Sequence, residues 1–235
     1  MKIEGRNAVS EALKGNLTID KLMVQEGINH SIIALARKKN IRIQFVDKQI
    51  LDKQSESGAH QGFVAFASEF VYSSVEEILA SKKDRHFIVI LDNIVDPHNL
   101  GSILRVCECA GVDGVIIPKN NSVCVNDTVV RVSCGATSYV KVARVTNINV
   151  CIEQLKKQNI WVYCAESNGQ SMYSTDLTGD IALVIGGEGQ GVSRLTRQLC
   201  DGAISIALQG KINSLNASVA CGIVVYEAVR QHLNK

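Results

Sequence analysis

The stretch FIVILDNIVDPHNLGSILRVCECAG, residues 87–111, decides the fold class of this 235-residue chain. It opens on an apolar run that ends at Asp92, which predicts a strand buried on both faces. A loop follows, and residues 101–111 then predict a helix with Ile103 and Cys107 on its core-facing side. A strand, a loop and a helix in this order are typical of a parallel sheet covered by helices.

The same alternation continues to the end of the chain. We expect further strands at residues 114–118, 160–166, 181–186 and 203–208, and further helices at residues 148–159, 192–200 and 217–233. The predicted fold is therefore α/β, a parallel sheet with helices on both faces. The loops that follow the strands are where such sheets bind ligands.

The N-terminal segment has a pattern of its own. Its expected elements are helices at residues 3–14 and 30–40 and strands at 21–26, 41–47 and 61–68. We interpret residues 1–70 as a small α/β domain, 71–85 as a linker with a polar second half, and 86–235 as the second domain.

Composition excludes several function classes. The formal net charge is only +2, so nucleic-acid binding requires a local patch of basic residues. The eight cysteines include no C-x-x-C pair and the five histidines are scattered, so we expect no metal site. Several cysteines lie inside apolar runs, where a free thiol acts as a small hydrophobe, which favours a reducing compartment.

We expect the protein to be cytoplasmic. The opening MKIEGRNAVSEALKG has acidic residues and no apolar core, unlike a signal peptide. No apolar run approaches the roughly 18 residues that a membrane span needs.

The loop at residues 91–105 carries the first unusual residues. Asn99 precedes the expected helix, where asparagine is a common N-cap, so a purely structural role is one interpretation. Arg105 lies on the polar face, one turn into that helix, where an anion such as phosphate is favoured. An ion pair of Arg105 with Glu108 is the alternative.

The second loop is IGGEGQG, residues 185–191, directly after an apolar run. It matches neither the dinucleotide fingerprint nor the P-loop, and Glu188 would repel phosphates in both. A carboxylate there suits hydroxyl or amino donors, or a cation such as a sulfonium. The alternative is a tight turn whose glycines only supply positive φ.

The third loop lies within residues 204–222, where Ser214 and Asn216 precede the last helix. Asn216 or Ser218 could cap that helix. Small residues at the helix start also favour close packing against another backbone or a ligand. A weaker feature is the run of small residues from Ser133 to Ser138, where the backbone could turn sharply.

Together these loops resemble the three motifs of the SpoU, or TrmH-like, family of RNA ribose 2′-O-methyltransferases. The resembling residues are Asn99-Leu100-Gly101 with Arg105, then IGGEGQG, then SLNASVACGI, in the family's order and within residues 87–232. IEGRNAVSEAL and HQGFVA resemble the small RNA-binding domain that many members carry. LDNIVDPHNLGSILR, SCGA and YEAVRQ are most similar to bacterial enzymes that methylate a guanosine of 23S ribosomal RNA.

The resemblance implies features that the residue pattern does not predict by itself. They are a C-terminal deep trefoil knot, S-adenosylmethionine as cofactor and a homodimer formed by the catalytic domain. It implies catalytic roles for Asn99, Arg105, Glu188 and Asn216. It also implies a cofactor pocket lined by Gly186, Gly187, Ile206, Ser214 and Leu215. Ala207 departs from the family, which often has proline there.

The implied function is methylation of a ribose 2′-hydroxyl in structured RNA, most closely a guanosine of large-subunit ribosomal RNA. Two alternatives stay open: a transfer RNA 2′-O-methyltransferase, and a non-catalytic RNA-binding or ribosome-assembly protein on the same fold. The presence of all four catalytic candidates argues against the second. A nucleotide-dependent dehydrogenase is disfavoured by the missing fingerprint.

Overall fold

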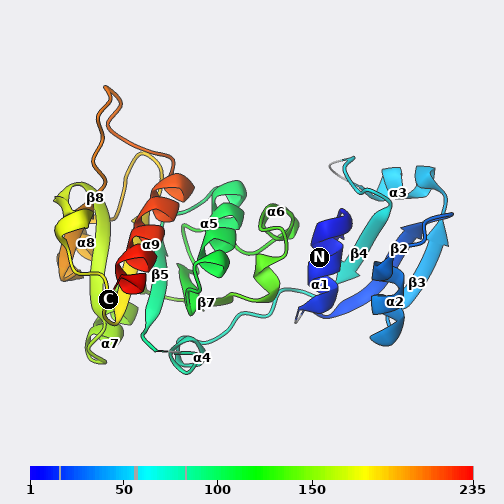
Figure 1. The fold of residues 1–235 in the computed structure, drawn as a ribbon, viewed down its shortest axis with the longest axis horizontal. Helices are drawn as coiled ribbons and strands as arrows, with labels where there is room; N and C mark the ends of the chain where they lie inside the picture. Colours follow the sequence, from blue (N-terminus) through cyan, green and yellow to red (C-terminus); the bar gives the residue numbers. More distant parts are fainter. Residues whose placement is uncertain (16, 56–57, 83, 235) are drawn as a thin grey trace. The chain divides into compact units, whose positions relative to one another are not determined.

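The computed structural model describes residues 1–15, 17–55, 58–82 and 84–234. Packing divides the chain into two units, which we describe separately (Figure 1). The N-terminal unit comprises Met1–Val71 and Val125–Tyr139, and the C-terminal unit comprises Tyr72–Cys124 and Val140–Lys235.

The N-terminal unit is built on a four-stranded sheet of order β1-β4-β2-β3. Its strands are β1 (Lys2–Glu4), β2 (Ile19–Gln25), β3 (Arg42–Val46) and β4 (Phe63–Ala67). Its first three helices are α1 (Arg6–Lys14), α2 (Ser31–Lys38) and α3 (Lys48–Gln54). β2 and β3 are parallel, whereas β4 runs antiparallel to both β1 and β2. The expected small α/β arrangement is present, although α3 was not anticipated and the first helix starts only after a short strand.

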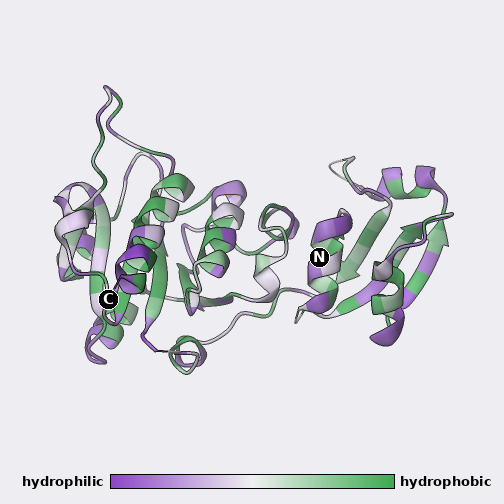
Figure 2. Ribbon diagram, in the orientation of Figure 1, coloured by the Kyte–Doolittle hydropathy of each residue, from purple (hydrophilic) through white to green (hydrophobic). Residues whose placement is uncertain are grey.

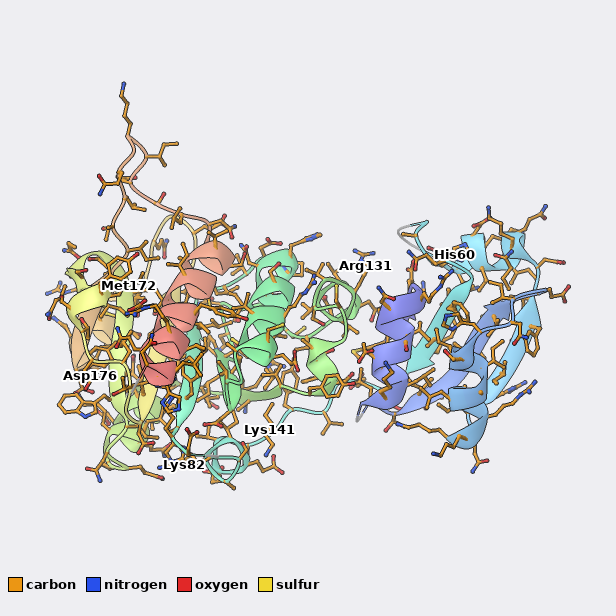
Figure 3. All side chains as sticks on the ribbon, viewed as in Figure 1. His60, Lys82, Arg131, Lys141, Met172 and Asp176 are labelled. Carbon is orange, nitrogen blue, oxygen red and sulfur yellow. The ribbon has the colours of Figure 1, made fainter. Side chains whose placement is uncertain are left out.

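Buried His60, labelled in Figure 3, fixes the turn that enters β4. Its Nε2 lies 2.8 Å from Asp52 Oδ1, and its Nδ1 accepts a hydrogen bond from the Gly62 N–H at 3.0 Å. Because both ring nitrogens are engaged, this histidine has a structural role.

The second part of the N-terminal unit is residues 125–139, which contain α6 (Asp127–Val132) and the short helix η1 (Ala136–Ser138). Tyr139 Oη donates a hydrogen bond to Glu11 Oε2 at 2.9 Å, and Val129 and Val130 are buried. The run of small residues seen in the sequence thus includes a sharp turn at Gly135. Residues 125–139 lie in the sequence between two strands of the C-terminal unit, but they pack with residues 1–71.

The C-terminal unit contains a six-stranded sheet of order β10-β8-β9-β5-β6-β7, and every neighbouring pair is parallel. The strands are β5 (Phe87–Asp92), β6 (Gly114–Pro118), β7 (Lys141–Val145), β8 (Trp161–Ser171), β9 (Ile181–Gly186) and β10 (Gly202–Ser205). The helices are α4 (Val75–Leu79), α5 (Pro97–Cys109), α7 (Ile148–Lys156), α8 (Arg194–Leu199) and α9 (Ala217–Leu233), with the short helix η2 (Met172–Ser174). The expected parallel sheet with helices is confirmed.

Helices cover both faces of this sheet. The even-numbered side chains of β5 and β9, including Ile88, Ile90 and Val184, share one core with α7. Successive strand residues point to opposite faces, so the odd-numbered side chains lie on the other face. That face is covered by α5 and α9, which pack against each other. In Figure 2 the strands are largely hydrophobic while the helices carry their hydrophilic residues on one side, as two-sided burial requires.

Three of the four cysteines in the apolar runs are buried, whereas Cys109 at the end of α5 is exposed. Cys107, Cys164 and Cys221 have no more than trace exposure, and all eight thiols are free. Burial also raises the pKa of the Cys151 thiol to about 11, which keeps it in the unreactive thiol form. None of the helices in the described part of the chain is long and apolar enough to cross a membrane.

In the C-terminal unit, β8 continues to Ser171 beyond the expected end at Glu166, and β10 ends at Ser205 before the expected end at Leu208. Three further differences from the sequence-based expectation have a local cause. The expected linker contains α4, started by Ser74 and Glu77, which form a capping box. β7 was missed because Lys141 and Arg144 interrupt its apolar alternation. The helix expected at residues 101–111 begins at Pro97, because Asp96 accepts the N–H groups of His98 and Asn99.

Buried Arg85 joins the start of β5 to the rest of the C-terminal unit. Its Nη1 donates to the Leu177 carbonyl at 2.6 Å and its Nη2 to the Ala228 carbonyl in α9 at 3.2 Å. Its guanidinium also lies over the Phe87 ring. Burial lowers the pKa of Arg85, while the nearby carboxylates raise it.

We expect Arg85→Ala to lower the free energy of unfolding by about 2–4 kcal/mol, because two buried carbonyls lose their donor. The measurement is urea denaturation followed by circular dichroism. Lys82→Ala is the control, since Lys82 forms a half-exposed ion pair with Asp180 and should cost less than about 1 kcal/mol. Equal losses for the two variants would contradict the structural role assigned to Arg85.

Candidate active site

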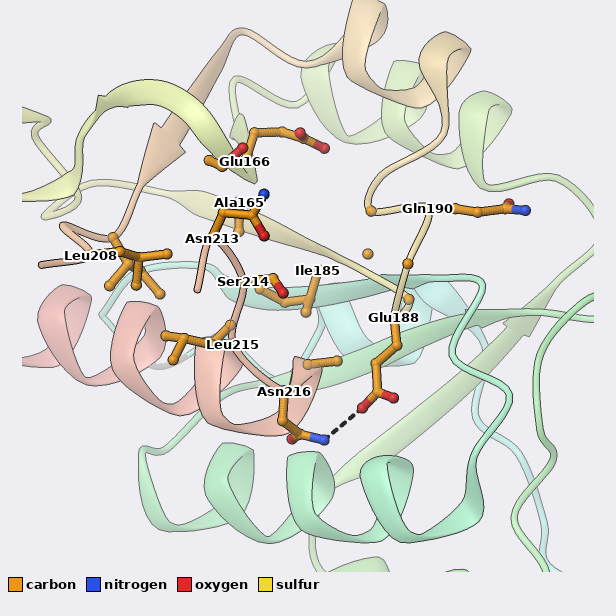
Figure 4. Close-up of a pocket in the computed structure, with 18 of the residues that line it drawn as sticks. Ala165, Glu166, Ile185, Glu188, Gln190, Leu208, Asn213, Ser214, Leu215 and Asn216 are labelled. Atoms are coloured by element: carbon orange, nitrogen blue, oxygen red, sulfur yellow. Dashed lines mark hydrogen bonds between the residues drawn. The ribbon is translucent and has the colours of Figure 1, made fainter. Parts of the chain in front are cut away.

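A cavity of about 900 Å³ lies where β9 and β10 end, beside the middle of β8 (Figure 4). Its wall combines residues 165–167 of β8, the end of β9, the loop after β9, the segment after β10 and the first turns of α9. These are loops at the carboxyl edge of a parallel sheet, which is where the sequence predicted binding. The volume is within the range of small-molecule sites.

The loop after β9 folds back on itself. Gly187 and Gly191 form an antiparallel bridge, and the Gly191 N–H donates to the Gly187 carbonyl at 3.0 Å. Gly189 and Gly191 have positive φ, whereas Gly186 is required for close approach: a Cβ there would lie 2.1 Å from the Gly191 carbonyl carbon. The loop is therefore a tight turn that also lines the cavity, and at Gly186 the glycine does more than supply positive φ.

Asn99, Glu188 and Asn216 form a closed hydrogen-bonded group. Asn99 Nδ2 donates to Glu188 Oε1 at 2.9 Å, and Asn216 Nδ2 lies 2.6 Å from the same oxygen. Asn216 Nδ2 also lies 2.9 Å from Asn99 Oδ1. Figure 4 shows Glu188 and Asn216 pointing toward each other, joined by the hydrogen bond between them. The three side chains come from α5, the loop after β9 and the start of α9.

The N-terminal turns of α5 and α9 position Asn99 and Asn216, respectively. Because Asp96 is the N-cap of α5, the cap interpretation of Asn99 is wrong. Asn99 instead lies in the first turn, where its buried amide is available to Glu188. Asn216 does cap α9, with Oδ1 accepting the N–H groups of Ser218 and Val219 at 3.0 and 3.3 Å. Its amide nitrogen remains for the bonds to Asn99 and Glu188, so this one residue serves both roles.

Arg105 lies apart from this group. It is an exposed residue of α5, six positions after Asn99, and it does not belong to the described lining of the cavity. Because Arg105 is exposed, it can contact a ligand that binds on the solvent side of α5.

The five residues implied as cofactor contacts all lie in the cavity wall. They are Gly186, Gly187, Ile206, Ser214 and Leu215. The described lining contains two carboxylates, Glu166 and Glu188, and no lysine, arginine or histidine. Such a wall favours a cationic ligand with hydroxyl or amino donors. In the described part of the chain, no group of three His, Cys, Asp or Glu side chains could hold a metal ion.

Sequence reasoning missed several lining residues, among them Glu166, Gln190 and Asn213. Glu166 ends the apolar run IWVYCAE, so the rule that polar residues after a strand mark the site could have found it. Asn213 lies in a long polar loop with no local signal, and only the fold brings it to the cavity.

We expect Gly186→Ala to abolish ligand binding in this cavity, because the new Cβ would overlap the backbone of Gly191 and displace the loop. Binding can be measured by calorimetry with the cofactor proposed below, and folding by thermal melting. Gly179→Ala is the matched control, since nothing lies within 4 Å of a Cβ at that glycine. Unchanged binding in Gly186→Ala would show that the loop is not part of the site.

A family model described as the SpoU rRNA Methylase family matches residues 86–226. The chain belongs to the SpoU family of RNA methyltransferases. A second model, RNA 2′-O ribose methyltransferase substrate binding, matches residues 2–73. The SpoU-family identity agrees with the three motifs and places all four catalytic candidates within the methylase match.

Relatives of this SpoU-family chain span nearly its whole length. A protein of Staphylococcus haemolyticus named as a TrmH family tRNA/rRNA methyltransferase is 43% identical over 97% of this chain and 95% of its own. A Bacillus subtilis protein named as a member of the same family is 39% identical over 97% and 94%.

Solved structures share the fold. The SpoU methyltransferase AviRb from Streptomyces viridochromogenes, in complex with AdoMet, has a TM-score of 0.87 at 24% identity over 100% of this chain and 91% of its own. The TrmH/SpoU tRNA modifying enzyme of A. aeolicus has a TM-score of 0.59 at 29% identity, covering 67% of this chain and 80% of its own.

Proposed function

We propose that this SpoU-family protein transfers a methyl group from S-adenosylmethionine to a ribose 2′-hydroxyl, on a guanosine of 23S ribosomal RNA. The observation that carries the proposal is the closed group of Asn99, Glu188 and Asn216 at the mouth of an acidic cavity. The substrate-binding match at residues 2–73 and the names of the relatives support RNA as the substrate class.

The cavity residues fit S-adenosylmethionine. Gly186 leaves its backbone accessible, at a position where any Cβ would collide with Gly191. The described part of the wall carries two carboxylates and no basic residue, which suits a cationic ligand. Backbone groups near Gly186, Ile206 and Leu215 would hold the nucleoside, with Ser214 as a further polar contact. When bound, this cofactor supplies an electrophilic methyl group on a positively charged sulfur.

The chain's own residues would orient and activate the ribose. A 2′-hydroxyl is a weak nucleophile until its proton is drawn away. Arginine side chains stay protonated in proteins, so Arg105 would grip an adjacent phosphate with its planar fork and stabilise the developing alkoxide. Asn99 and Asn216 hold Glu188 in one position, and this preorganised group would align the ribose for in-line attack.

The N-terminal unit would grip structured RNA, since a mononucleotide offers too little surface for recognition. Transfer RNA is the alternative substrate, because the relatives are named for both RNA classes. The test is methyl transfer in vitro from labelled S-adenosylmethionine to 23S ribosomal RNA and, separately, to transfer RNA. Label in 23S ribose supports the proposal, label in transfer RNA alone selects the alternative, and label in neither indicates a non-catalytic RNA-binding protein.

We extend the proposal to assembly, topology and compartment. The exposed apolar residues Ile212, Leu215, Val219 and Tyr226 on and before α9 support a homodimer through the catalytic domain. The contact of Asn216 with the loop after β9 is compatible with a C-terminal trefoil knot. The eight thiols, all free, favour the cytoplasm.

A further inference from the structure

Glu166 of β8 is hydrogen-bonded to the return side, residues 191–192, of the loop after β9, whose tip carries Glu188. Glu166 Oε1 accepts a hydrogen bond from the Val192 N–H at 3.1 Å. The side chain is only 15% exposed, and in Figure 4 its carboxylate points toward the segment that follows Gln190. β8 pairs with β9 only as far as Cys164, so Glu166 lies just where the two strands separate.

The fit between Glu166 and this segment is close. A Cβ at Gly191 would lie 3.3 Å from Glu166 Oε1, so the carboxylate already rests against the loop backbone. Arg197 Nη1 lies 4.0 Å from Glu166 Oε2, and the Arg197 side chain is 46% exposed. The hydrogen bond to the backbone is therefore the stronger of the two interactions.

The loop after β9 is thus fixed at two separate points. Asn99 and Asn216 hold its tip through Glu188, and Glu166 holds its return side through Val192. The tip carries the catalytic carboxylate, whereas Gly189, Gln190 and Gly191 form cavity wall. The two anchors therefore serve different parts of the site.

We propose that Glu166 is a positioning residue for cofactor binding, acting through its hydrogen bond to the Val192 N–H. This inference rests on the proposed function. Without the hydrogen bond from Val192, residues 189–191 of the cavity wall are no longer held in place. Glu188 remains hydrogen-bonded to Asn99 and Asn216. Cofactor affinity should therefore fall while turnover at saturating cofactor is retained.

The test compares Glu166→Ala and Glu166→Gln with the wild-type protein. Alanine removes the acceptor, and we expect it to raise the KM and the Kd for S-adenosylmethionine about tenfold or more, with kcat within about threefold. Glutamine keeps an acceptor oxygen but loses the charge, and we expect it to restore both constants to within about threefold of wild type. Arg197→Ala should leave Kd within about twofold.

Other outcomes overturn the proposal. If Glu166→Gln binds as weakly as Glu166→Ala, the charge and not the hydrogen bond is responsible. If Glu166→Ala lowers kcat as much as it raises KM, Glu166 does not act on the wall alone. Asn168→Ala is the matched control, because Asn168 is an exposed β8 residue outside the described cavity lining, and it should bind as wild type.

Calorimetry on the wild-type protein separates this inference from the proposed function. If the wild-type protein does not bind S-adenosylmethionine, the proposed function fails. If the wild-type protein binds and Glu166→Ala binds equally well, only the positioning role fails. Thermal melting of Glu166→Gln guards against a folding defect, because that variant retains the shape and the acceptor.

Discussion

Asn216→Ser should lower kcat/KM for RNA methylation by about 100-fold or more while leaving stability nearly unchanged. Serine is as good an N-cap as asparagine, so α9 keeps its start. The shorter side chain cannot reach Glu188 or Asn99, so the closed group opens and the carboxylate is no longer held. Activity is measured with labelled cofactor and stability by urea denaturation.

Asn216→Ala separates the two roles of this residue. It removes both the cap and the amide, so activity should fall as in the serine variant, with an added loss of about 1 kcal/mol in the free energy of unfolding. If the serine variant retained activity within about threefold of wild type, Asn216 would be a helix cap and nothing more.

Arg105→Lys should lower kcat/KM by about 100-fold or more, because lysine keeps the positive charge but loses the planar fork that grips phosphate. Cofactor Kd should be unchanged, since Arg105 is not in the described cavity lining. The measurements are steady-state methylation of RNA and calorimetric binding of S-adenosylmethionine.

Glu108→Gln is the control for Arg105, because the alternative interpretation paired these two side chains on the surface of α5. If that pair were the role of Arg105, both variants would lose activity equally. We expect Glu108→Gln to stay within about threefold of wild type. Near-normal turnover of Arg105→Lys would refute bidentate binding of phosphate.

Much of the catalytic sheet could be predicted from local sequence. β5, β6, β9 and α9 have the bounds that the sequence predicts, because the strands are short apolar runs and α9 is a long segment of small and apolar residues that Asn216 caps. β7 and α6 were not predicted, since Lys141 and Arg144 interrupt the apolar alternation of β7 and the six residues of α6 are too few to show a helical period. The packing of residues 125–139 with the N-terminal unit likewise depends on contacts such as Tyr139 with Glu11, which are 128 positions apart.

The site was predictable only in part, for a related reason. Asn99 lies 89 positions from Glu188 and 117 from Asn216, and no spacing rule brings them together. The resemblance of three separate loops to one family connected them, and the geometry then showed how they contact one another. Glu166 was missed because it is a single carboxylate within β8, and its partner is a backbone N–H that side-chain patterns do not reveal.

We propose that this protein methylates one ribose of 23S ribosomal RNA. The most direct measurement maps 2′-O-methyl groups across ribosomal and transfer RNA from cells with the protein, without it, and with only its Arg105→Lys variant. We predict that one guanosine of 23S ribosomal RNA loses its 2′-O-methyl group without the protein and does not regain it with the variant. An unchanged map of both RNA classes would contradict the account.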